Sequence, residues 1–274
     1  MAHETRVRGA ITNITAGGAS LIALAPIYLV FVNALKTQAD ASSMGVDVPS
    51  HLQWGNFDTV ITQGKLVTAF FNSALYSFGA TALAVLASAL AAYVLARHRT
   101  RRHQIIYLLL IAGIAIPTNF VTLTKVMQVT HLIDTQVGMI LLYAATQIPF
   151  SVFLIYAFVD TLPRELDEAA FIDGCSPLRT FFSIILPMLT PVLVTCGVLD
   201  LLNVWNEFLM PLYFLNSTQN WPMTLAVYNF FGQYQADWSL VSADVVLTIL
   251  PVILIYIVAQ RWILSGLGSG AVKG

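Results

Sequence analysis

Residues 165–187 read ELDEAAFIDGCSPLRTFFSIILP and lie between two long apolar runs of the chain. A Glu-Ala-Ala triplet begins at Glu168, Gly174 follows it after three residues, and an Ile-x-Leu-Pro string begins at Ile184 after nine more. The acidic residues favour a helix start, because the helix dipole stabilises negative charge there. Pro163 suits its first turn and Gly174 its left-handed end. A short capped helix between apolar runs predicts a rigid element that a soluble partner protein binds and moves as a unit.

The rest of the chain is strongly apolar. Hydrophobic residues make up 57% of its 274 residues, charged residues only 10%, and the mean hydropathy is +0.76. A soluble domain carries about a quarter charged residues, so most of this surface must face lipid. The net charge of −1 and the lack of a basic stripe argue against binding to nucleic acid. The composition therefore predicts a polytopic membrane protein.

Six apolar segments are long enough to span a bilayer, which takes about 20 helical residues. Backbone groups in hydrocarbon must be paired within their own segment, so an all-α fold of six transmembrane helices in one domain is expected. The expected spans cover about 14–35, 73–96, 105–127, 138–159, 187–210 and 242–261, with a coupling loop at about 160–186.

The basic residues predict the orientation of these spans. Ten of the 13 precede the first span, follow the sixth, or lie in the second-to-third and fourth-to-fifth links, and only three lie on the other side. By the positive-inside rule, both termini and the 160–186 loop are expected in the cytoplasm, where ATP is. The two longer links on the opposite side carry aromatic residues, which are either interfacial anchors or a docking surface for an external protein.

The fifth span carries unusual polar residues, and they are candidate translocation-path residues. At 100° per residue, positions 196, 200, 203 and 207 share one face, and carboxylates at membrane depth normally face protein or water. Lining a path for a sugar and hydrogen bonding between helices are both open interpretations. The candidates are Asp200, Asn203, Trp205, Asn206 and Glu207.

The chain has no sign of an enzyme. It contains no Gly-rich phosphate loop, no metal-ligand cluster and no G-x-S-x-G or HExxH pattern, so it is not expected to hydrolyse ATP or to bind a metal or cofactor itself. Cys175 lies in the polar loop and Cys196 inside a span, so a disulfide between them is not expected. A self-sufficient secondary transporter that uses the intramembrane carboxylates is the alternative, although such a protein would show internal repeats.

Several motifs together give the chain a family resemblance. The loop described above resembles the signature loop of permease subunits of ATP-binding-cassette importers. Trp205-Asn206-Glu207-Phe208, the break at Ile116-Pro117 and the Ala91–Arg97 string are similar to elements of the carbohydrate-uptake, maltose-transporter type. The chain departs from the family's usual pattern at Cys175 of the loop, where Ala is common, and at Glu207 of the fifth span, where Asp is common. The resemblance covers nearly the whole chain.

This resemblance implies a type I ABC importer permease fold in a bacterial cytoplasmic membrane. It implies a second homologous permease subunit, two ATPase subunits that bind ATP and Mg²⁺, and an extracytoplasmic solute-binding protein. The substrate would be a sugar or a related solute. The implied contacts to the ATPase are Glu165, Glu168, Ala169, Ala170, Asp173, Gly174, Ile184, Leu186 and Pro187 in the loop, with Gly270 and Lys273 in the C-terminal tail.

Overall fold

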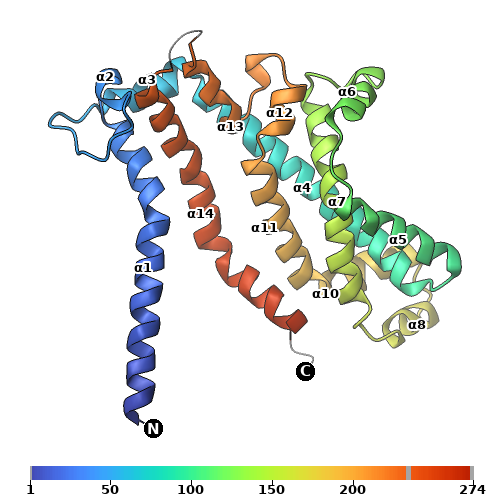
Figure 1. Ribbon diagram of the computed structural model, residues 1–274. Helices are drawn as coiled ribbons and strands as arrows, with labels where there is room; N and C mark the ends of the chain where they lie inside the picture. The colour runs from blue at the N-terminus through green and yellow to red at the C-terminus, as the bar shows by residue number, and fades with distance from the viewer. Residues whose placement is uncertain (1, 233–235, 272–274) are drawn as a thin grey trace. The chain divides into compact units, whose positions relative to one another are not determined.

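The computed structural model describes residues 2–232 and 236–271, and helices make up the regular structure of this part (Figure 1). Over these residues, β pairing is limited to an isolated bridge between Phe231 and Ala236. The all-α fold class that the composition predicts is therefore confirmed. The chain forms two compact units, Met1–Val67 with Ala226–Pro251, and Thr68–Leu225 with Val252–Gly274.

The helices follow one another along the chain through short links. The first unit contains α1 (Ala2–Ala34), α2 (Gln38–Ala41), α3 (Gly55–Gln63), a 3₁₀ turn (Val227–Phe230) and the first part of α14 (Trp238–Ala271). The second unit contains most of α4 (Leu66–Arg97), α5 (Arg101–Ala115), α6 (Phe120–Val129), α7 (Gln136–Val159), α8 (Glu165–Ile172), α9 (Pro177–Thr180), a π-helix (Phe181–Ile185), α10 (Leu186–Met188), α11 (Thr190–Asn206), α12 (Leu209–Phe214), a 3₁₀ turn (Thr218–Asn220) and α13 (Met223–Ala226).

Four described helices are long and apolar enough to cross a membrane: α4, α7, and the apolar stretches of α1 and α14. Two bent helix pairs raise this number to six if each pair is one span. The third expected span corresponds to α5 with α6, and the fifth to α9–α10 with α11. The expectation of six spans thus holds only with these two bent pairs, and neither of them is a straight helix.

The bend between α5 and α6 measures 117° and has a local cause. Pro117 forces the residue before it out of the helical conformation, and Ile116 is accordingly extended, with φ −82° and ψ 117°. The next helix starts anew at Asn119, whose side chain accepts a hydrogen bond of 3.0 Å from the amide of Thr122. The sequence Ile-Pro-Thr-Asn therefore breaks the third expected span.

The bend before α11 measures 77° and follows an irregular helical segment. Residues Phe181–Ile185 form a π-helix directly before Pro187, which has no amide hydrogen to donate. Leu189 ends α10, its amide donating to the carbonyls of Ile185 and Leu186, both at 3.1 Å. The chain leaves the polar loop here and turns into α11.

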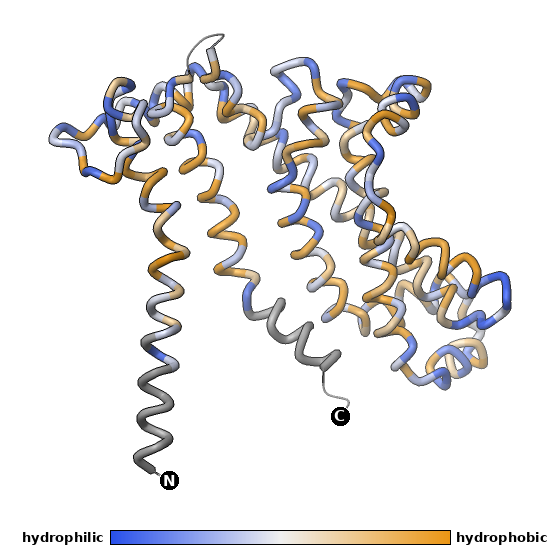
Figure 2. The backbone as a smooth tube through the Cα atoms, viewed as in Figure 1, coloured by the Kyte–Doolittle hydropathy of each residue, from blue (hydrophilic) through white to orange (hydrophobic). Residues whose placement is uncertain are grey.

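The second unit packs around small residues of α4. Ala89, Ala92 and Ala96 are buried with apolar side chains of α7, of the π-helix and of α11. Small side chains let transmembrane helices approach closely. Figure 1 shows α7 and α11 side by side, in agreement with the hydrogen bond between Ser151 and Asp200 that joins them. In Figure 2 the long helices are mainly hydrophobic, whereas hydrophilic residues gather at the α4–α5 turn and on α8.

In the first unit, the link that follows α1 is tied back to the end of that helix. Asn33 and Lys36 are buried, and both donate to the carbonyl of Gly45, at 3.0 and 2.7 Å. Asn56 donates to the carbonyls of Ala34 and Lys36, at 2.8 and 2.9 Å. The bond to Ala34 satisfies one of the free carbonyl groups that every helix leaves at its C-terminus, and the others hold the link against it.

Candidate functional site

The polar loop forms the helix that its sequence predicts, α8, and both of its ends follow simple rules. Glu165, Asp167 and Glu168 occupy the first turn, where the dipole favours negative charge. Gly174 adopts the left-handed conformation, with φ +75°, and its amide donates to the carbonyl of Phe171 at 3.0 Å. The amide of the next residue donates to Ala170 at 2.9 Å, which completes a Schellman motif.

Pro163 does not lie in the first turn of this helix, contrary to the prediction. The N-cap is Arg164, and helical residues begin at Glu165. The carbonyls of Leu162 and Pro163 instead accept hydrogen bonds from the Arg97 guanidinium, at 3.1 and 3.4 Å. The link before α8 is therefore held against the end of α4 rather than wound into the helix.

One face of α8 is exposed and mixes acidic with apolar side chains. Phe171 and Ile172 are 81% and 82% exposed, and Glu165, Glu168 and Asp173 are exposed around them. The sequence reasoning selected the acidic residues but missed the two apolar ones. A signal was available: an aromatic and a β-branched residue follow the alanines directly in an otherwise polar helix.

The two alanines of the triplet lie on different faces of α8. Ala169 is exposed, but Ala170 is only 2% exposed. Ala170 lies four residues after Leu166 and three after Asp167, so all three fall on one side of the helix, and the latter two are half-buried. Both alanines are implied contacts to the ATPase, but only Ala169 lies on the exposed face of α8.

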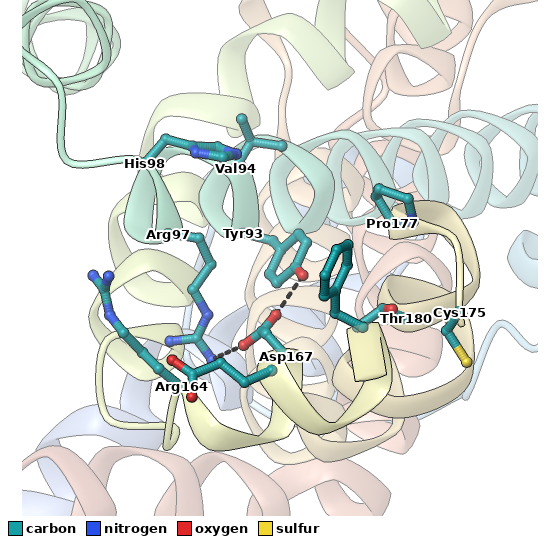
Figure 3. A pocket seen from close by; sticks show the side chains of 11 residues that line it. Tyr93, Val94, Arg97, His98, Arg164, Asp167, Cys175, Pro177 and Thr180 are labelled. Atoms are coloured by element: carbon teal, nitrogen blue, oxygen red, sulfur yellow. Dashed lines mark hydrogen bonds and ion pairs between the residues drawn. The ribbon is translucent and has the colours of Figure 1, made fainter. Parts of the chain in front are cut away.

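A polar cluster attaches the buried face of α8 to the end of α4 (Figure 3). The Tyr93 hydroxyl donates to Asp167 Oδ1 at 2.5 Å, and Arg97 Nη2 lies 2.9 Å from Asp167 Oδ2. In Figure 3 the carboxylate lies between the phenol and the guanidinium. The side chains of Arg97 and Asp167 are 11% and 23% exposed. An open pocket of about 430 Å³ beside them is lined by α4, α8 and α9.

The remaining expected contacts lie at several places in the loop. Ile184 and Leu186 are half-buried and pack against the apolar cluster of α4, α7 and α11. Pro187 is exposed, as are Leu178 and Phe182 in the same segment. In the tail, Gly270 lies in the last turn of α14, and Lys273 lies outside the described residues.

The polar residues of the fifth span divide into two groups. Asp200 and Trp205 are buried, and Asp200 Oδ2 accepts a hydrogen bond of 2.8 Å from the Ser151 hydroxyl of α7. Asn203 and Asn206 are exposed on α11, one turn apart. Asp200 therefore makes the helix-to-helix contact that was one of the two interpretations, while the two asparagines lie on the exposed side of α11.

Glu207 does not share the helical face predicted for it. Helix α11 ends at Asn206, and Glu207 is extended, with φ −71° and ψ 134°. Its carboxylate accepts hydrogen bonds from the amides of Leu209 and Met210, at 3.1 and 2.7 Å. The first amides of a helix have no hydrogen-bond acceptor within the helix, so Glu207 caps the start of α12.

The candidate metal ligands of the described residues lie apart from one another. Over residues 2–232 and 236–271, no three His, Cys, Asp or Glu side chains gather as metal ligands. Both cysteines are free, Cys196 buried and Cys175 half-buried beside the α8 pocket. The site at α8 is an exposed patch of acidic and apolar side chains on a short helix that is bonded to the end of α4.

Comparisons with known proteins agree with this description. Residues 84–267 match the family "Binding-protein-dependent transport system inner membrane component". The chain is 32% identical over 256 residues, 93% of each chain, to a probable starch degradation products transport system permease protein, AmyC, of Thermoanaerobacterium thermosulfurigenes. It is 31% identical over 258 residues to the diacetylchitobiose uptake system permease protein NgcG of Streptomyces coelicolor, covering 93% of this chain and 85% of that protein.

The fold is also that of a known structure. A bacterial ABC transporter involved in the import of the acidic polysaccharide alginate contains a chain that matches with a TM-score of 0.81 at 19% identity, over 93% of this chain and 96% of that one. The relatives are transport permeases, which confirms the resemblance predicted from the loop and decides against a self-sufficient secondary transporter or a membrane enzyme. The chain is a multi-pass membrane protein that belongs to the family of inner membrane components of binding-protein-dependent transport systems.

Proposed function

We propose that this permease subunit takes part in the import of a sugar or oligosaccharide across a bacterial cytoplasmic membrane. A separate ATPase binds α8 and drives the transport. Together with a homologous second permease this subunit encloses the path, two ATPase subunits bind ATP and Mg²⁺ on the cytoplasmic side, and an external binding protein delivers the solute. The relatives named for starch products and diacetylchitobiose support the substrate class. The positive-inside bias supports cytoplasmic termini and a cytoplasmic α8.

The observation that carries the ATPase contact is the composition of the exposed face of α8. Phe171 and Ile172 are almost fully exposed, and large exposed apolar side chains mark interaction sites when they cluster. Lipid does not cover them here, because the carboxylates of Glu165, Glu168 and Asp173 surround them. The surface fits a soluble protein whose groove has an apolar floor and a basic rim.

The solute path is supported by the fifth span. Asn203 and Asn206 expose amide groups on α11, and amides both donate and accept hydrogen bonds, as sugar hydroxyl groups require. Asp200 and Trp205 are buried within the subunit and contribute to packing rather than to the path. In the proposed cycle, ATP-driven closure of the ATPases moves α8 and opens the path outward, and hydrolysis resets it.

The test uses the complete transporter, with this chain substituted at two positions of α8. Glu168→Lys replaces an acidic rim residue by a basic one and is expected to weaken retention of the ATPase by at least about tenfold, the effect of losing an ion pair and gaining repulsion. Gly174→Pro cannot adopt φ +75° and removes the amide that ends the helix, so it is expected to have the same effect.

Each variant is purified through a tag on this chain, and the ATPase that co-purifies is quantified. Gly174→Asn is the matched control for the second position, because asparagine tolerates the left-handed conformation and should retain the ATPase. Membrane insertion should be normal in all three. Full retention of the ATPase by both Glu168→Lys and Gly174→Pro would overturn the proposal.

A further inference from the structure

We propose that Tyr93, Arg97 and Asp167 form a positioning clamp that makes α8 and the end of α4 move as one body. The inference rests on the proposed function, since it concerns how a movement of α8 imposed by an ATPase reaches a membrane span. None of the three residues belongs to the exposed face of α8. The clamp is therefore a device separate from the contact with the ATPase.

The first support is the number of bonds that Arg97 makes across three segments. Its guanidinium pairs with Asp167 of α8 at 2.9 Å and donates to the carbonyls of Val159 and Leu162, at 3.5 and 3.1 Å. It also donates to Pro163 at 3.4 Å. The planar guanidinium offers five donors in a rigid fork. One side chain of α4 thus joins the end of α7, the link after it, and α8.

The second support is that α8 lies outside the apolar cluster that holds the segments after it against α4. The π-helix and α10–α11 enter the apolar cluster that buries Ala89, Ala92 and Ala96 of α4. In the described part of the chain that cluster includes no residue of α8. The inward side of α8 instead carries Asp167, whose two oxygens meet Tyr93 and Arg97. The clamp therefore bonds the inward side of α8, which also carries the buried Ala170, to the end of α4.

The third support is burial, which sets this ion pair apart from its neighbour. The Arg97 and Asp167 side chains are 11% and 23% exposed, whereas those of Arg99 and Asp160 in the adjacent ion pair are 57% and 42% exposed. Exposed pairs contribute little, because water and salt screen them. Removing one partner of a shielded, hydrogen-bonded pair has a much larger effect. The exposed Arg99–Asp160 pair is therefore a matched control for the shielded Arg97–Asp167 pair.

The experiment measures the distance between α8 and α4 within one chain during the ATPase cycle. Nitroxide labels are placed at Arg164→Cys, the exposed N-cap of α8, and at Leu75→Cys, an exposed α4 position well away from the clamp, in a Cys175→Ser background. Pulsed EPR distances are recorded on the complete transporter in lipid vesicles, without nucleotide and after trapping with ATP and vanadate. A rigid clamp predicts the same distance in both states.

The clamp variants are expected to release α8 from α4. Asp167→Asn removes the charge, and the loss of a hydrogen bond to a charged group shifts an equilibrium by about tenfold or more. We expect at least about a tenfold larger population with a displaced distance after trapping. Tyr93→Phe removes one hydrogen bond, keeps the ring and should cause a smaller displacement. Asp167→Glu retains the charge and should restore part of the rigid population.

Asp160→Asn removes the exposed pair with Arg99 and should leave the distance as in the unsubstituted chain. An unchanged distance in both Asp167→Asn and Tyr93→Phe would overturn the inference, even if less complex assembles. So would a distance that already shifts between the two states in the unsubstituted chain. Failure of the unsubstituted chain to retain the ATPase would instead contradict the proposed function.

Discussion

Asp200 shows how a single polar residue inside a span can join two helices of one subunit. The side chain is fully buried, its Oδ2 accepts the Ser151 hydroxyl, and in the described part of the chain Oδ1 has no hydrogen-bond partner. Polar contacts between transmembrane helices stabilise their packing. Asp200 thus fixes how α7 and α11 lie against each other, and the exposed Asn203 is left for contacts outside the subunit.

This role of Asp200 predicts an energetic coupling with Ser151. In a double-mutant cycle of Ser151→Ala and Asp200→Ala, we expect an interaction energy of about 0.5–2 kcal/mol, the range for hydrogen bonds between membrane helices. The measurement is reversible unfolding in mixed detergent micelles. The matched cycle of Ser151→Ala with Asn203→Ala should be additive, because Asn203 points away from the helix contact. Additivity in the first cycle would remove the role assigned to Asp200.

At the scale of elements, the loop after α6 and the segment after α12 are joined by one carboxylate. Asp134 Oδ1 accepts hydrogen bonds from the amides of Asn216 and Ser217, at 3.1 and 3.0 Å, and from the Asn220 side chain at 3.3 Å. Oδ2 accepts the Ser217 hydroxyl. Partial burial raises the pKa of Asp134, but these bonds to the charged form outweigh it and lower the pKa below 3.8.

The lowered pKa of Asp134 predicts a pH-dependent stability. A carboxyl whose pKa is lower in the folded state stabilises the fold above the unfolded pKa, and this contribution is lost as the pH falls through the folded pKa. We therefore expect Asp134→Asn to be less stable than the unsubstituted chain at neutral pH. The difference should narrow below about pH 4. Thermal unfolding in detergent at several pH values measures it, and a difference that is constant with pH would contradict the prediction.

Local sequence rules predicted some elements of this structure well and others poorly. The ends of α8 were predictable because acidic residues and Gly174 act on their immediate neighbours. Pro163 and Ala170 were misplaced, because their positions depend on Arg97 and on the side of α8 that faces the body. Glu207 was misplaced because helical periodicity does not reveal that α11 ends at Asn206. Contacts with distant segments decided the first two cases, and a cap on the next helix decided the third.

At the scale of the whole molecule, the sequence predicted the fold class and the family from the composition and the loop together. Four spans were readable as continuous apolar runs, and each lies in a single helix. The other two are bent pairs, one broken at Pro117 and the other containing the π-helix before Pro187. The clamp between Asp167 and α4 could not be predicted, because it joins residues 74 positions apart in the sequence. Because of this clamp, we expect the solvent-exposed helix α8 to move together with the membrane-embedded helices.

The central claim is that the exposed face of α8 is held by an ATPase, and site-specific photocrosslinking tests it most directly. A benzoyl-phenylalanine at Phe171, 81% exposed, is compared with one at Tyr213, an aromatic residue that is 54% exposed on α12. After irradiation of intact membranes that contain the complete transporter, we expect the probe at Phe171 to yield an adduct with the ATPase and the probe at Tyr213 to yield none. Adducts with the ATPase from Tyr213 alone, or from neither position, would contradict the account.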